Sequence, residues 1–180
     1  MELARCPWPK TTPLIDAIER FDMRGMRNLI EAGANVNEED PLGKVPLCAV
    51  LALPHRLRKE PFATLIFAGA NPDKVQYPTR YFPEIVPFLR VVEENDFSEA
   101  VFLHLRGVNV HVQNSKRQNA LMLTQNPDML EWLDTLGLDP HASDIHGHNA
   151  AWYRQNAGRI RVKKDLVQVI EERARLAVSS

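Results

Sequence analysis

Short apolar segments recur along the chain, and each is followed by a glycine and a polar stretch. The segments MRNLIEA, FATLIFA, AVFLHLR and MLEWLDTL resemble helices with one apolar face. Glycine is the usual residue just past a helix end, because it takes a positive φ angle without a steric cost. The pattern therefore predicts four helices, which end before Gly33, Gly69, Gly107 and Gly137.

The stretches that follow these glycines keep the same phase. Seven residues after the glycine stand Asp40, Gln76, Asn114 and Asp144, and ten residues after it stand Gly43, Thr79, Arg117 and Gly147. A Pro or Ala then opens the next apolar segment in most units, as suits the first turn of a helix. A loop and a helix that recur in phase indicate a stack of repeated units.

This phase predicts where the helices lie. We expect helix pairs at 13–20 and 23–32, 46–53 and 61–68, 84–94 and 97–106, and 120–124 and 127–136. The fifth unit begins at residue 150, and an amphipathic helix from Lys163 to Ala177 closes the stack. The segment 54–61 begins and ends with proline and holds a basic run, so a surface loop is expected there.

The repeat also predicts which side chains are buried. Phe67, Leu103, Leu105 and Trp132 are expected to pack between units, and Cys48 is expected to be a small buried residue of a helix. Charged residues between the helices are expected to face solvent, namely Arg56, Arg58, Lys59, Glu93, Glu94 and Asp96.

Five phased segments resemble the ankyrin family. They are TPLIDAI (12–18), GANVNEEDPLGKVPLCAV (33–50), GANPD (69–73), GVNVHVQNSKRQNALML (107–123) and GLDPHASDIHGHNAA (137–151). The resemblance implies an all-α ankyrin-repeat solenoid of about five helix-turn-helix units with hairpin-like tips, closed by the C-terminal capping helix. It makes residues 1–180 a single domain with units near 12–44, 45–80, 81–118, 119–148 and 149–177. The third unit departs most, because it lacks the tip glycine.

In the resembled family, the tips and the first helices bind other proteins. Carried onto this chain, that property makes partner contacts of Glu38, Glu39, Asp40, Leu42, Tyr77, Arg80, Lys116, Arg117, Ile145 and His146. Trp152 and Tyr153 would extend the same surface. Two alternatives stay open: Leu42 and Ile145 could pack against neighbouring tips, and Trp152 could belong to the core.

A lone array of this length resembles small bacterial ankyrin proteins, among them immunity proteins that neutralise a cognate toxin. The hypothesis is therefore a non-enzymatic protein that binds and inhibits a protein such as a toxin. The alternative is a scaffold or secreted effector that binds a larger cellular partner. A near-neutral net charge of −1 argues against nucleic acid as the partner. The two cysteines and the lack of a long apolar run indicate a cytoplasmic protein without a membrane partner.

One cluster offers a chemical alternative. Three histidines and two aspartates lie within ten residues, namely Asp139, His141, Asp144, His146 and His148, and these residue types bind transition metals. Side chains of a hairpin alternate between two faces, so few of these five would converge on one ion. The chain also lacks phosphate-binding loops and nucleophile or metalloprotease motifs. We therefore expect no cofactor, no bound metal, no small-molecule substrate and no enzymatic activity.

Overall fold

The structure is a computed structural model that describes residues 11–157. Within that range it contains helices and no strand, so the all-α fold class is confirmed there. The helices are α1 (Pro13–Glu19), α2 (Met23–Glu31), α3 (Pro46–Leu51), α4 (His55–Phe67), α5 (Pro87–Glu93), α6 (Phe97–Leu105), α7 (Ala120–Leu123), α8 (Pro127–Thr135) and α9 (Ala150–Gln155). None of these helices is long and apolar enough to cross a membrane. The expected capping helix at 163–177 lies outside the described residues.

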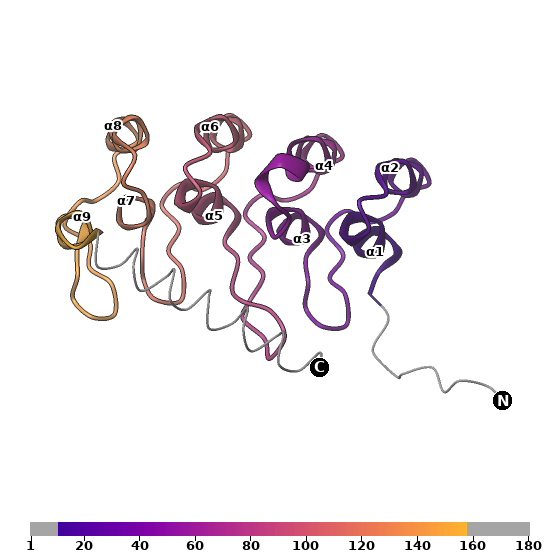
Figure 1. The fold of residues 1–180 in the computed structure, drawn as a ribbon, viewed down its shortest axis with the longest axis horizontal. Helices are drawn as coiled ribbons and strands as arrows, with labels where there is room; N and C mark the ends of the chain where they lie inside the picture. Colours follow the sequence, from indigo (N-terminus) through magenta and orange to yellow (C-terminus); the bar gives the residue numbers. More distant parts are fainter. Residues whose placement is uncertain (1–10, 158–180) are drawn as a thin grey trace, which may run out of the picture.

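The helices form two rows (Figure 1). The first helices α1, α3, α5, α7 and α9 contact one another in chain order, and α2, α4, α6 and α8 each pack on the first helix of their own pair. We call α2, α4, α6 and α8 the second helices. The long loops between pairs project beyond the row of first helices, on the side away from the second helices (Figure 1).

Local sequence explains where most helices begin and end. Proline occupies the first turn of α1, α3, α5 and α8, where the missing N–H group has no helical partner to lose. Side chains of Thr12, Asp22, Asp96, Asn126 and Asn149 accept hydrogen bonds from the first-turn N–H groups of the helices that they precede. Gly33, Gly69, Gly107 and Gly137 follow the second helices with φ between 71° and 92°.

One apolar core runs through the whole stack. Every residue of α3 is buried, and the buried face of α5 continues the core toward α7. Each second helix adds between one and three large apolar side chains to it, such as Met26, Leu65, Leu103 and Leu133. A helix pair therefore buries its apolar surface only against its neighbours, as is typical of repeat proteins.

The expected surface loop at 54–61 is wrong. Helix α4 begins at His55, and Pro61 lies inside it. A proline within a helix removes one backbone hydrogen bond and normally disfavours the preceding turn. Here Arg58 is fully buried and forms ion pairs with the next helix pair, which holds the first turns of α4 in place.

The expected packing of the second helices holds for two of four residues. Leu103 is fully buried, and the half-buried Trp132 lies against Phe88 and Phe97. Phe67 and Leu105 are instead 67% and 76% exposed, which corrects the expectation for both. Both residues lie at the C-terminal end of a second helix, and the contact of Phe67 with the Phe102 ring of α6 leaves most of the Phe67 ring exposed.

Candidate functional site

Three of the hairpin loops are held by the same hydrogen bonds. A side-chain oxygen of Asp40, Asn114 or Asp144 accepts from the backbone N–H groups two and four residues further on, at 2.8 to 3.0 Å. The expectation that Asp40 contacts a partner is thereby corrected, because Asp40 is buried and its carboxylate holds the loop. Asp40, Asn114 and Asp144 therefore hold the backbone of their loops, and we call residues with this role frame residues.

The position three residues later closes each turn. Gly43, Arg117 and Gly147 adopt positive φ angles of 81°, 58° and 78°. Their N–H groups donate to the carbonyl groups of Asp40, Asn114 and Asp144 at 2.8 to 3.1 Å. Arg117 adopts this conformation without being glycine, and its side chain is exposed at the tip.

The loop between the second and third pairs departs from this frame. Gln76 and Ile85 exchange two backbone hydrogen bonds at 3.0 and 2.9 Å, and Gln76 Nε2 donates to the carbonyl oxygen of Pro83 at 3.1 Å. The residues between them form a longer tip. That tip leaves Tyr77 72% exposed and also exposes Arg80.

Neighbouring loops are bonded to one another. The N–H group of Asn71 donates to Asn37 Oδ1 at 2.7 Å, and that of Asn109 donates to Asp73 Oδ1 at 2.8 Å. Near the tips, the N–H group of Ile145 donates to the carbonyl oxygen of Lys116 at 3.0 Å. The loops therefore form one continuous edge, which we call the loop edge.

Most of the candidate residues lie outward on the loop edge. The exposed ones are Glu38, Glu39, Tyr77, Arg80, Lys116, Arg117, Ile145 and His146. Leu42 is half-buried. The first tip is acidic and the second and third tips carry exposed basic residues, although Glu39 also forms an ion pair with Lys74 at 3.1 Å. A partner would thus meet acidic residues at the first tip and basic residues at the next two tips.

Trp152 and Tyr153 support the fourth loop. The Tyr153 hydroxyl group donates to Asp144 Oδ2 at 2.7 Å and accepts from Gln118 Nε2 at 2.6 Å. The Trp152 ring stacks on His148 with ring centres 3.6 Å apart. Both side chains are half-buried, so each still presents part of its surface to solvent beside the loop edge.

These contacts shift two pKa values. Burial alone would raise the pKa of Asp144, but hydrogen bonds from Tyr153 and from two backbone N–H groups outweigh it, so the pKa lies below its usual value. Burial, together with the hydrogen bond to Asp144, raises the pKa of Tyr153. Asp144 therefore stays ionised and Tyr153 stays protonated at neutral pH.

A groove of about 350 Å³ lies beside the longer loop. Its walls include Lys44, Cys48, Gln76 and Phe82. Lys44 forms an ion pair with Glu19, and its ammonium group lies 4.0 Å from the centre of the Phe82 ring. Lys44 and Phe82 are not among the candidates that the sequence predicted. The longer spacing between the second and third units was the feature that could have indicated them.

Cys48 lies at the bottom of this groove but is fully buried, as expected. Burial raises the pKa of its thiol to about 12. The thiolate is the nucleophilic and metal-binding form of cysteine, and it is scarce at neutral pH when the pKa is so high. Cys48 therefore acts as a packing residue.

The histidine and aspartate cluster at 139–148 does not form a metal centre in the described structure. Within residues 11–157, no three side chains of His, Cys, Asp or Glu are grouped so that they could hold an ion. Asp144 uses both carboxylate oxygens in hydrogen bonds, and Asp139 Oδ1 accepts from the N–H group of His141 at 2.8 Å. The carboxylates of this cluster thus serve the loops.

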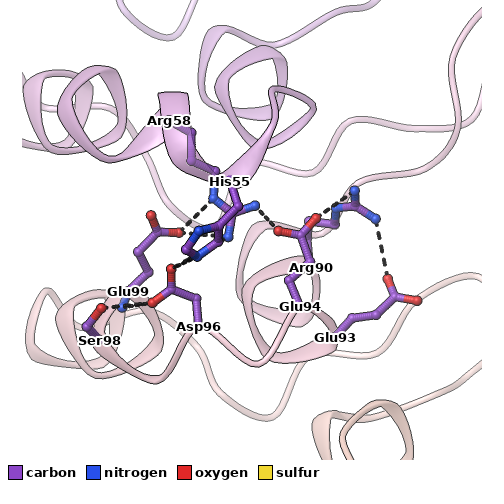
Figure 2. A network of polar contacts seen from close by, with 8 residues as sticks. All are labelled: His55, Arg58, Arg90, Glu93, Glu94, Asp96, Ser98 and Glu99. Atoms are coloured by element: carbon purple, nitrogen blue, oxygen red, sulfur yellow. Dashed lines mark hydrogen bonds and ion pairs between the residues drawn. The ribbon is translucent and has the colours of Figure 1, made fainter.

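A second polar cluster joins α4 to the turn between α5 and α6 (Figure 2). The buried Arg58 donates to Glu94 and, through Nε at 3.1 Å, to Glu99, while His55 contacts Asp96. The expectation that Arg58, Glu94 and Asp96 face solvent is corrected, since Arg58 and Asp96 are buried and Glu94 is partly covered. Sequence showed only a basic run and an acidic turn; their contact depends on the stacking of two pairs.

The carboxylates of this cluster have opposite pKa shifts. Burial raises the pKa of Glu99, and the attraction of Arg58 offsets only part of that effect. Burial also acts on Asp96, but hydrogen bonds from Ser98, from the Glu99 N–H group and from His55 outweigh it and lower the pKa. Arg58 has no exposed surface and is paired with carboxylates of the next helix pair, although its Nη2 atom and Glu99 Oε1 have no hydrogen-bond partner. The cluster therefore acts as a structural bridge between two helix pairs.

Comparison of the chain with models of known protein families gives no match, and comparison with curated proteins gives none.

Proposed function

We propose that this chain is an ankyrin-type solenoid that binds another protein through its loop edge and the adjacent first helices. Two independent features support the architecture. Glycines and polar frame residues recur in phase along the sequence, and helix pairs joined by hairpin-like loops lie side by side in one stack (Figure 1).

One observation carries the proposed function: the loops separate frame residues from outward-facing residues. Asp40, Asn114 and Asp144 hold the backbone, whereas tip residues such as Tyr77 and Arg80 have exposed side chains. Such tips can take many side chains without loss of the fold. Side chains at such positions can therefore be selected for binding to a partner.

The outward residues have the chemistry of a protein interface. Tyr77 and Ile145 are large apolar side chains that are more than half exposed, and Arg80 and Arg117 lie on the same edge. Tyrosine and arginine are enriched among residues that dominate binding energy. The groove lined by Phe82 and Gln76 offers a recess in which a partner side chain could be anchored.

The partner that we propose is a cognate toxin, which the chain would inhibit by covering its active site. The loop edge is acidic at its first tip and basic at its second and third tips, so a partner with the reverse arrangement would be attracted and oriented before contact. Inhibition of this kind needs no catalytic residue in the chain.

Co-expression tests this proposal. The chain should form a stable complex with the product of the adjacent gene, and that product should be toxic when it is expressed alone. Tyr77→Glu should weaken the complex and leave the helical circular dichroism unchanged. Gln125→Glu is the matched control, because Gln125 is exposed at the turn between α7 and α8, away from the loop edge.

Two results would contradict the proposal. A neighbouring product that neither binds nor is toxic would remove the immunity function. Equal loss of binding in Tyr77→Glu and Gln125→Glu would show that the loop edge is not the binding surface.

A further inference from the structure

The second helices lie on the side of the stack opposite the loop edge (Figure 1), and they carry a patch of exposed apolar side chains. Phe67 on α4 and Leu105 on α6 are 67% and 76% exposed, and Phe97 at the start of α6 is 41% exposed. The Phe67 ring lies 5.8 Å from the Phe102 ring, and the Arg106 guanidinium group lies 4.6 Å from the centre of the Phe67 ring. Large apolar side chains gathered at the centre of a solvent-facing side are typical of an interaction surface.

The two ends of this patch carry opposite charges. The exposed residues of α2 and the first half of α4 are mainly basic: Arg24, Arg27, Arg56 and Lys59, with Glu31 and Glu60. The exposed charged residues of α8 are all acidic: Asp128, Glu131 and Asp134. Arg27 and Glu60 pair with each other, so the other basic residues give the α2 end its positive charge. A basic end, a centre of exposed apolar side chains with Arg106 against the Phe67 ring, and an acidic end therefore follow one another along the row.

A surface with this order is complementary to itself. The second helices run in the same direction, because each pair repeats the same connection. A half-turn about an axis parallel to these helices reverses the order of the row. It places α2 of one copy over α8 of the other and α4 over α6. Phe67 and Leu105 then meet, since each ends its helix at the same level, and the basic end lies over the acidic end.

We propose that the occupant of this surface is a second copy of the same chain, bound through the second helices in that two-fold arrangement. The other possible axis, along the row, would set like charges opposite each other and is disfavoured. In the favoured arrangement both loop edges point away from the contact, so a dimer presents two separate binding edges. This inference goes beyond the proposed function and does not depend on it.

Sedimentation velocity of the full chain over a concentration series tests the self-association. The wild type should show a monomer–dimer equilibrium. Leu105→Glu and Phe67→Ala should each raise the dimer dissociation constant by at least about tenfold, because the first puts a carboxylate into an apolar contact and the second removes the ring that makes it. Both residues are exposed, so the fold should survive, and Tyr77→Glu on the loop edge should dimerise as the wild type does.

A charge exchange tests the arrangement. One variant, Asp128→Lys with Glu131→Lys, makes the α8 end basic; another, Arg24→Glu with Asn28→Glu, makes the α2 end acidic and keeps the pair of Arg27 and Glu60. Each variant alone should be monomeric, and an equal mixture of the two should sediment as a heterodimer.

Three results would overturn the proposal. They are a wild type that stays monomeric at every concentration, an apolar-patch variant that dimerises as well as the wild type, and a mixture of the two charge variants that stays monomeric.

Discussion

Arg58 on α4 and Glu99 on α6 form a buried ion pair between two neighbouring helix pairs. Arg58 Nε donates to Glu99 Oε2 at 3.1 Å, and the two side chains are 0% and 7% exposed. A buried charge is costly unless it is paired. The first turns of α4 therefore depend on the helix pair that follows them. Removal of either ion-pair partner should destabilise both helix pairs.

Replacing Arg58→Met should destabilise the fold strongly. The change leaves Glu99 and part of Glu94 without their cation, and breaking a buried pair costs about 3–5 kcal/mol. Urea unfolding followed by circular dichroism measures the loss. Lys59→Met, at the exposed neighbouring position, should change the free energy of unfolding by less than about 0.5 kcal/mol. Similar effects of the two substitutions would contradict the assigned burial of Arg58.

Asp144→Asn should reduce the loss of stability in acid. The folded pKa of Asp144 lies below its ordinary value of 3.8, so its contribution is present above that pH and is lost as the pH falls through the folded pKa. Asparagine occupies the same position in the preceding loop, as Asn114, so the variant should keep the turn. The unfolding free energy should therefore be measured for the variant and the wild type at pH 7 and below about pH 4. The difference between the two proteins should shrink as the pH falls.

Tyr153→Phe provides the second arm of that experiment. It removes the hydrogen bond that does most to lower the pKa of Asp144, so the acid dependence should become weaker without disappearing. An acid dependence that is the same in the wild type and in both variants would show that Asp144 is not the group responsible.

Gly107→Ala should destabilise the stack through the backbone alone. Gly107 has a φ angle of 79°, and a Cβ atom added there would meet nothing within 4 Å, so steric contact plays no part. The left-handed conformation should cost alanine about 1–2 kcal/mol. Thermal unfolding should show a smaller loss for Gly107→Asn, because asparagine tolerates this conformation better. Equal losses for alanine and asparagine would argue against a backbone cause.

Cys48 should be unreactive in the folded protein. Its side chain is fully buried, and the pKa of its thiol is raised to about 12. In a Cys6→Ser background, where Cys48 is the remaining thiol, a disulfide reagent at about pH 8 should label the chain only after denaturant is added. Rapid labelling under native conditions would show that the groove gives access to the sulfur atom.

Features that depend on a few neighbouring residues could be predicted from the sequence. Glycine φ angles, first-turn prolines and side-chain caps act within one turn, so the predicted ends of α1, α2, α3, α6, α7 and α8 lie within two residues of those found. The same local rules predicted the phase of the loops. That phase placed Tyr77, Lys116 and Ile145 at tips where their side chains are exposed.

Features that depend on contact between units were decided only by the tertiary structure. The segment that forms α4 combines a proline before its first residue, a second proline inside it, basic residues and a short apolar run. Nothing local shows that Arg58 meets Glu94 and Glu99 some forty residues later. The exposure of Phe67 and Leu105 has the same origin, because a helical pattern marks apolar residues but not which of them the neighbouring helix covers. Burial in a stack depends on two adjacent helix pairs, so the sequence of one segment does not determine which of its side chains are buried.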